Sequence, residues 1–132
     1  MGKLIFFGLM LCMVACHKEP VKDCFSEIPA LSIYGEWNAE LINSQSTKGT
    51  LSFSAFGTFT SNPADLIIPN KFFGAFLSSQ KFSIDSTGIR FSGITSDQKK
   101  QINSDYLFSS YKCDYIELKS LDHADTKLIL TR

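Results

Sequence analysis

Hydrophobic and polar residues alternate along most of the chain after Pro29. In the segment 36–41, Trp37, Ala39 and Leu41 fall on one side and three polar residues fall on the other. A period of two is that of a β-strand with one buried face. The pattern therefore predicts a β-rich domain that opens with this strand.

The same alternation predicts two hairpins. The segments 50–55 and 58–60 alternate on either side of Gly57, after a polar turn at 43–49. A second pair of strands carries Phe82 with Ile84 and Ile89 with Phe91, and the turn residues 85–88 separate them. The segment 61–70 contains two prolines, so we expect a loop with an apolar tip or a short edge strand there.

The pattern changes at Thr95. The tetrapeptide 95–98, Thr-Ser-Asp-Gln, matches the capping box that begins a helix. Ile102 and Tyr106 then recur at helical spacing. We therefore expect a short helix over residues 97–110, followed by two last strands at 113–121 and 127–131.

These elements predict one mostly β domain of the α+β class. We expect an antiparallel sheet or a small barrel-like meander of about seven or eight strands, with one short helix before the last two strands. We expect three parts, namely an apolar leader at 1–15, a charged tether at 16–30 and the β-rich domain at 31–132. The twelve phenylalanines suit the filled interior of such a sheet or barrel.

The first fifteen residues have the features of an export signal. Lys3 precedes an uncharged apolar run from Leu4 to Ala15. As a helix this run spans about 18 Å, which is too short for a hydrocarbon core of roughly 30 Å. It therefore fits the apolar region of a signal peptide, which is removed from the mature protein.

The residues Met13-Val14-Ala15-Cys16 resemble the lipobox of bacterial lipoproteins. The resemblance implies cleavage before Cys16 and acylation of that cysteine, which makes the lipid bilayer a partner. We expect an exported protein anchored in the cell envelope, in the outer membrane, with the periplasmic and surface faces both open. An ordinary secretory signal with cleavage nearby is the alternative.

Two cysteines remain once Cys12 is removed with the signal and Cys16 is lipidated. An exported chain enters a compartment in which disulfides persist. We therefore expect Cys24 and Cys113 to form a disulfide, and two separate thiols are the alternative.

Charge and composition exclude several function classes. The 13 basic and 13 acidic residues balance, which gives no argument for a nucleic-acid partner. The two histidines, His17 and His123, belong to no cluster with metal-ligand spacing, and a solvated turn is the better interpretation of His123. Glycine-rich phosphate loops and nucleophile motifs are absent from the sequence. We expect no catalytic residues, no metal, no cofactor and no enzymatic activity.

The domain resembles the META family of small heat-inducible bacterial lipoproteins. The resemblance is carried by the start Gly35-Glu36-Trp37 and by the segment 70–76, Asn-Lys-Phe-Phe-Gly-Ala-Phe. It implies structural roles for five residues, namely Trp37, Asn70, Phe72, Gly74 and Phe76. A helix before the last two strands is typical of that family. Pro69, where the family often has a cysteine before the asparagine, departs from its pattern.

A second resemblance is to lipocalin-like domains of small lipoproteins. These also open with Gly-x-Trp, as at Gly35 and Trp37, and continue with a Phe-x-x-x-Gly-Thr hairpin, as at 53–58. The expected helix favours the META family over this alternative.

Two function hypotheses follow. The first is a non-enzymatic interaction or envelope-integrity module that meets an envelope protein through an apolar patch. The patch would comprise Leu66, Ile67, Ile68 and Phe73, and the alternative is that these residues belong to the core. The second hypothesis is a carrier whose barrel holds a small apolar ligand.

Overall fold

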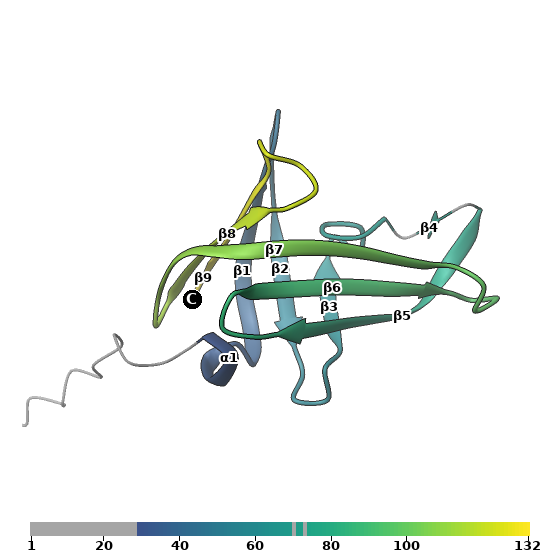
Figure 1. Cartoon of the computed structure of the whole chain (residues 1–132), viewed down its shortest axis with the longest axis horizontal. Coiled ribbons are helices and arrows are strands. Elements are labelled where there is room, and N and C mark those ends of the chain that lie inside the picture. The colour runs from purple at the N-terminus through teal and green to yellow at the C-terminus, as the bar shows by residue number, and fades with distance from the viewer. Residues whose placement is uncertain (1–28, 70, 73) are drawn as a thin grey trace, which may run out of the picture.

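The computed structural model describes residues 29–69, 71–72 and 74–132, and within them it is almost entirely antiparallel β-sheet (Figure 1). The elements of these residues are α1 (Pro29–Ser32), β1 (Gly35–Ile42), β2 (Ser46–Phe53), β3 (Phe59–Asn62), β4 (Lys71–Phe72), β5 (Ala75–Ile84), β6 (Gly88–Thr95), β7 (Gln101–Lys112), β8 (Tyr115–Ser120) and β9 (Lys127–Thr131).

The strands form an up-and-down meander. Their order in the sheet is β3-β2-β1-β9-β8-β7-β6-β5-β4, so almost every strand pairs with its neighbour in the chain. The exceptions are β3 and β4, which lie at opposite ends of the order. The last strand also pairs with the first, as at Ala39 and Leu130. The short β4 pairs with the start of β5 alone. The sequence-based prediction of an antiparallel, barrel-like sheet is therefore confirmed.

The other eight strands curl into a nearly closed barrel. The free edges of β3 and β5 approach each other, and an isolated bridge joins Thr58 to Lys81. Beside it, the backbone N–H of Phe82 donates a hydrogen bond of 2.9 Å to the carbonyl of Gly57. In Figure 1 the long strands β5, β6 and β7 cross in front of β1, β2 and β3. Closure of this kind leaves few unpaired backbone groups at sheet edges.

The period of two seen in the sequence sends one face of each strand into the barrel. Trp37 and Ala39 of β1 are buried in this way, and so are matching pairs on β2, β6, β8 and β9. The centre is occupied by the aromatic cluster, which comprises Phe53, Phe59, Phe82, Phe91 and Tyr106. Phe91 is fully buried, and its ring lies 5.0 Å from that of Phe59 and 5.7 Å from that of Tyr106.

The end of the barrel at which β1 begins is closed by α1. The indole N–H of the buried Trp37 donates a hydrogen bond of 2.7 Å to the carbonyl of Ile33, just after the helix. The guanidinium of Arg132 lies 4.1 Å from the centre of the Trp37 ring. The same group donates hydrogen bonds to the carbonyls of Ser32, at 3.1 Å, and of Tyr34. One arginine thus ties the last strand to the first strand and to the helix.

The expected helix over residues 97–110 is wrong, because this segment contains most of β7, a strand of 12 residues. The capping-box residues do bond to one another, but as a tight turn between β6 and β7. The hydroxyl of Thr95 donates to Asp97 at 2.5 Å and accepts from the N–H of Lys100 at 3.1 Å. Gln98 has a positive φ of 56°, which stops a right-handed helix at once.

The spacing of Ile102 and Tyr106 caused the error. Residues four positions apart share a face both in a helix and in a strand. In β7 the face that contains Ile102, Ser104 and Tyr106 packs toward the interior, as a period of two requires.

The remaining elements confirm the alternation. The hairpin around residues 85–88 and the last two strands are present, with β8 and β9 at 115–120 and 127–131. The first hairpin has a shorter turn than expected, because β2 begins at Ser46. In the described part of the chain, no helix has the length and apolar character needed to cross a membrane.

The contacts of Arg132 generate a prediction about stability. We expect Arg132→Ala to lower the free energy of unfolding by about 1 to 3 kcal/mol, because hydrogen bonds to a charged group and a cation–π contact are lost together. Urea unfolding followed by circular dichroism measures the change. Arg90→Ala is the matched control, since it removes an exposed ion pair worth at most about 1 kcal/mol. Equal losses in the two variants would contradict the role of Arg132.

Candidate functional site

A pocket of about 350 Å³ lies at the open end of the barrel, opposite α1. This end is where β1, β3, β6 and β8 finish, because neighbouring strands are antiparallel. We call it the mouth pocket, and its lining residues are Leu41, Asn43, Ile67, Ile68, Pro69, Ile102, Asn103, Ser104, Tyr106, Asp122, His123 and Thr126.

One side of the mouth pocket is apolar. Ile67 and Ile68 come from the loop between β3 and β4, and they line the pocket together with Leu41 of β1 and Ile102 of β7. Ile68 is 1% exposed, whereas the other three are partly buried against the core. Prolines at 63 and 69 flank this loop segment and restrict its backbone. These side chains provide a wall for the apolar part of a ligand.

The other side of the mouth pocket is polar and is built by the loop between β8 and β9. The hydroxyl of Ser120 accepts hydrogen bonds of 3.2 Å from the N–H groups of Asp122 and His123. A carboxylate oxygen of Asp122 accepts a hydrogen bond of 3.4 Å from the N–H of Asp105 in β7. The loop is therefore held against β7 while the side chains of Asp122 and His123 line the pocket.

Tyr106 connects the mouth pocket to the aromatic cluster. Its ring makes an edge contact with Phe91 below, and its side chain also lines the pocket. Burial raises the pKa of the Tyr106 hydroxyl, and the negative charge of Asp122 raises it further, whereas a hydrogen bond with Ser104 acts in the opposite direction. The phenol is therefore neutral at physiological pH and can both donate and accept a hydrogen bond.

Apolar walls with a few polar groups on one side are the usual design of a small-molecule site. The volume of about 350 Å³ is at the small end of the range of roughly 300 to 1,000 Å³ found for such sites. The mouth pocket can hold the short apolar part of a ligand and form hydrogen bonds with one polar group of that ligand.

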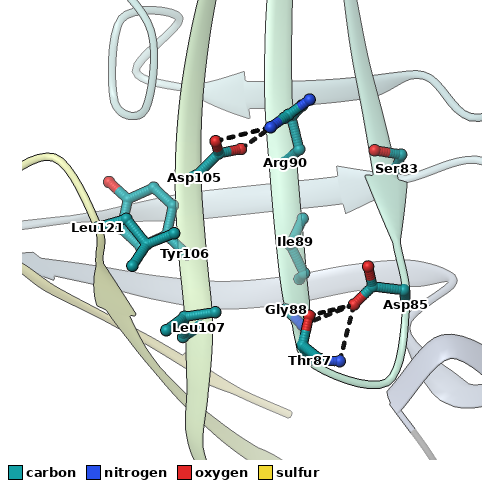
Figure 2. A pocket seen from close by; sticks show the side chains of 10 residues that line it. All are labelled: Ser83, Asp85, Thr87, Gly88, Ile89, Arg90, Asp105, Tyr106, Leu107 and Leu121. Atoms are coloured by element: carbon teal, nitrogen blue, oxygen red, sulfur yellow. Dashed lines mark hydrogen bonds and ion pairs between the residues drawn. The ribbon is translucent and has the colours of Figure 1, made fainter.

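A second depression, of about 280 Å³, lies beside the mouth pocket on the outer surface (Figure 2). Its charged groups are already paired with one another. Arg90 holds Asp105 through two hydrogen bonds of 2.7 and 2.9 Å, and this contact lowers the pKa of Asp105. Asp85 accepts from Thr87 and from the Gly88 N–H, and these bonds, led by the Thr87 hydroxyl, lower its pKa. These contacts fix the hairpin and leave little for a ligand.

A third pocket, also of about 350 Å³, lies over the outer face of β1, β2 and β9. Glu40, Lys48 and Asn38 line it, and Ile129 is its one large apolar residue among the described residues. It lacks the apolar walls of the mouth pocket, so we do not favour it as a ligand site.

The residues singled out from the META resemblance do not form a site. Trp37 is a buried core residue at the α1 end, whereas Gly74 has a positive φ of 80° and Phe76 is 55% exposed. Phe72 lies in β4, which pairs with β5. Asn70 lies outside the described residues.

The expected apolar patch is corrected at two positions. Leu66 and Ile68 are 4% and 1% exposed and belong to the core. Ile67 is partly buried and lines the mouth pocket, while Phe73 lies outside the described residues. The prolines and the apolar run correctly predicted a loop with an apolar tip. The apolar side chains of this tip pack into the core.

The predicted cysteine chemistry falls largely outside the described residues. Cys16 and Cys24 both precede residue 29. Cys113 lies in the turn between β7 and β8 and is not a free thiol. The pairing of Cys24 with Cys113 and the lipidation of Cys16 stay predictions.

Sequence reasoning did not find the polar side of the mouth pocket. Asp122 and His123 were assigned to a solvated turn, and both are exposed there. Tyr106 was assigned to a helix face. Only the meander, which places the β8–β9 loop beside the start of β7, brings the three together.

Comparison with known proteins adds no relative, because no family model, no curated protein and no solved structure matches this chain. Among the described residues, no group of three or more His, Cys, Asp or Glu side chains is placed to hold a metal ion.

Proposed function

We propose that the chain is an exported, lipid-anchored envelope protein whose barrel binds a small, partly apolar molecule at its open end. The observation that carries the proposal is the mouth pocket, with apolar walls at Ile67 and Ile102 and polar groups at Tyr106 and Asp122. The interior below it is filled by the aromatic cluster, so the pocket is the place where a ligand fits.

The topology supports the lipocalin-like alternative over the META resemblance. Eight strands in up-and-down order are typical of lipocalin barrels, which hold a small ligand, and the mouth of a β-barrel is a common place for a small-molecule site. The feature that favoured the META family was the helix before the last two strands, and β7 occupies that segment.

The hypothesis of an interaction module has less support. It rested on an exposed apolar patch of Leu66, Ile67, Ile68 and Phe73. Of these, Leu66 and Ile68 are buried, and Phe73 lies outside the described residues. Of the exposed large apolar residues, Phe56 and Phe76 lie on different segments of the described chain, and Leu107 and Leu121 line the depression whose charged groups are already paired.

The position of α1 fits an anchor at Cys16. The chain enters the barrel at the end opposite the mouth pocket, and 13 positions separate Cys16 from Pro29. A segment of this length reaches at most about 45 Å when fully extended. An anchored barrel would then be held by its closed end, with the mouth free to meet a ligand.

Cys113 lies at this same closed end. The N–H of Arg132 donates a hydrogen bond of 3.1 Å to the carbonyl of Asp114, next to Cys113. Cys24 precedes α1 by only a few residues. A disulfide between Cys24 and Cys113 would therefore have to span only a short distance. It would tie the tether to the β7–β8 turn.

The pocket itself is tested by filling it. Ile102→Trp places a larger side chain in the mouth pocket, and we expect it to abolish the rise in thermal midpoint that 1-hexanol produces in the parent protein. Circular dichroism of the full chain in phosphatidylcholine nanodiscs measures the midpoint. Ile129→Trp, on the outer face, is the matched control and should keep the response. The proposal fails if the parent shows no response or if the two variants respond alike.

The anchor is tested by removing the acylated sulfur. Two or three acyl chains, at about 0.8 kcal/mol for each buried CH₂, hold a small domain on a membrane essentially permanently. We therefore expect Cys16→Ser to move the protein from the membrane fraction to the soluble fraction of an expressing bacterium. Cys24→Ser is the control and should stay with the membranes. Membrane retention of the Cys16→Ser protein would contradict the anchor.

A further inference from the structure

The charges in the mouth pocket are one-sided. Among its described lining residues, Asp122 is the one carboxylate, and none is lysine or arginine. Of the cations on the neighbouring strands, Arg90 pairs with Asp105, Lys127 lies 3.7 Å from Glu117, and Lys119 of β8 does not line the pocket. Lys99 lies in the β6–β7 turn and does not line the pocket. A carboxylate ligand would therefore meet a negative charge there with no compensating cation.

The polar lining also favours hydrogen-bond donors. The Asp122 carboxylate accepts one hydrogen bond of 3.4 Å from the N–H of Asp105, which leaves its other acceptor positions available to a ligand. The hydroxyls of Ser104 and Tyr106 line the pocket next to it and can accept as well. An ammonium group has three donors and no acceptor, so it fits these three oxygens.

Two independent features link the charge of Asp122 to the interior of the pocket. The N–H of Asp122 donates a hydrogen bond to the hydroxyl of Ser120, and the Asp122 carboxylate accepts one from the N–H of Asp105, so both the backbone and the carboxylate are held beside β7. The negative charge of Asp122 also contributes to the raised pKa of the Tyr106 hydroxyl, so its field reaches the polar wall. His123 also lines the pocket and is exposed, as Asp122 is, and beside a neutral imidazole the carboxylate is the one full charge of the lining.

We propose that the mouth pocket selects a small amine, in which a positively charged ammonium group contacts Asp122 and a short apolar chain packs against Ile67 and Ile102. This inference rests on the proposed binding function and names the ligand class. The apolar wall contributes binding to any short alkyl chain, whereas the polar side discriminates between headgroups by charge. The small volume of about 350 Å³ restricts the apolar part to a short chain.

The proposal is tested with three probes that share a six-carbon chain, namely hexylamine, 1-hexanol and hexanoate. Dissociation constants come from thermal midpoints of the full chain in nanodiscs of zwitterionic phosphatidylcholine, with empty nanodiscs as the blank. We expect hexylamine to bind about fivefold more tightly than 1-hexanol, the upper range for an exposed ion pair. Hexanoate should bind more weakly than 1-hexanol.

Two matched variants test which carboxylate causes the preference for hexylamine. Asp122→Asn keeps the size and the oxygen that accepts from Asp105, and it should remove the difference between hexylamine and 1-hexanol while 1-hexanol still binds. Asp125→Asn changes an exposed carboxylate of the same loop that does not line the pocket, and it should leave the preference intact.

Several outcomes would overturn the inference. Binding of hexanoate as tight as that of hexylamine would show that the pocket does not select for positive charge. Loss of the preference in Asp125→Asn as well as in Asp122→Asn would assign it to the overall charge of the loop. If 1-hexanol binds and hexylamine binds no more tightly, the proposed selectivity is wrong and the proposed binding function stands. If none of the three probes binds, the proposed binding function fails with it.

Discussion

The filled interior of the barrel constrains everything else in this protein. The fully buried Phe91 contacts the rings of Phe53, Phe59 and Tyr106, and Phe82 makes an edge contact with Phe53. These rings occupy the space between the two walls of the sheet. Close packing of this kind contributes strongly to stability, because aromatic side chains bury large apolar areas and gain further from edge-to-face contacts. It also moves any ligand site to the end of the barrel, where Tyr106 forms the boundary between the core and the mouth pocket.

The two ends of the barrel differ, because one is closed by the helix and the other is open to a ligand. At one end Arg132 stacks on Trp37 and hydrogen-bonds to carbonyls beside α1, so that the last residue of the chain holds the first helix and strand. At the other end a loop with apolar side chains and a loop with Asp122 flank an open pocket. The chain enters at the closed end, so a tether there and a ligand at the mouth do not compete for space.

The sequence predicted the strands well wherever polar and apolar residues alternate, because one buried face imposes a period of two on each strand. Residues 82–91 and 127–131 are examples. It failed at 97–110, because Thr95 and Asp97 form hydrogen bonds within a tight turn and not at the start of a helix, and because Ile102 and Tyr106 suit both periods. The mouth pocket could not be predicted from the sequence, because Asp122 and Tyr106 are 16 positions apart and only the meander brings them together.

The central claim is that a solid barrel binds its ligand at the mouth alone. It is tested most directly by the methyl spectra of the isotope-labelled protein during titration with hexylamine. The account predicts shifts for the methyl groups of Ile67 and Ile102, which line the mouth pocket, and none for those of Ile116 and Leu118, which are buried in the barrel wall. Shifts at Ile116 and Leu118 that equal or exceed those at the mouth would contradict it, because the ligand would then enter the interior.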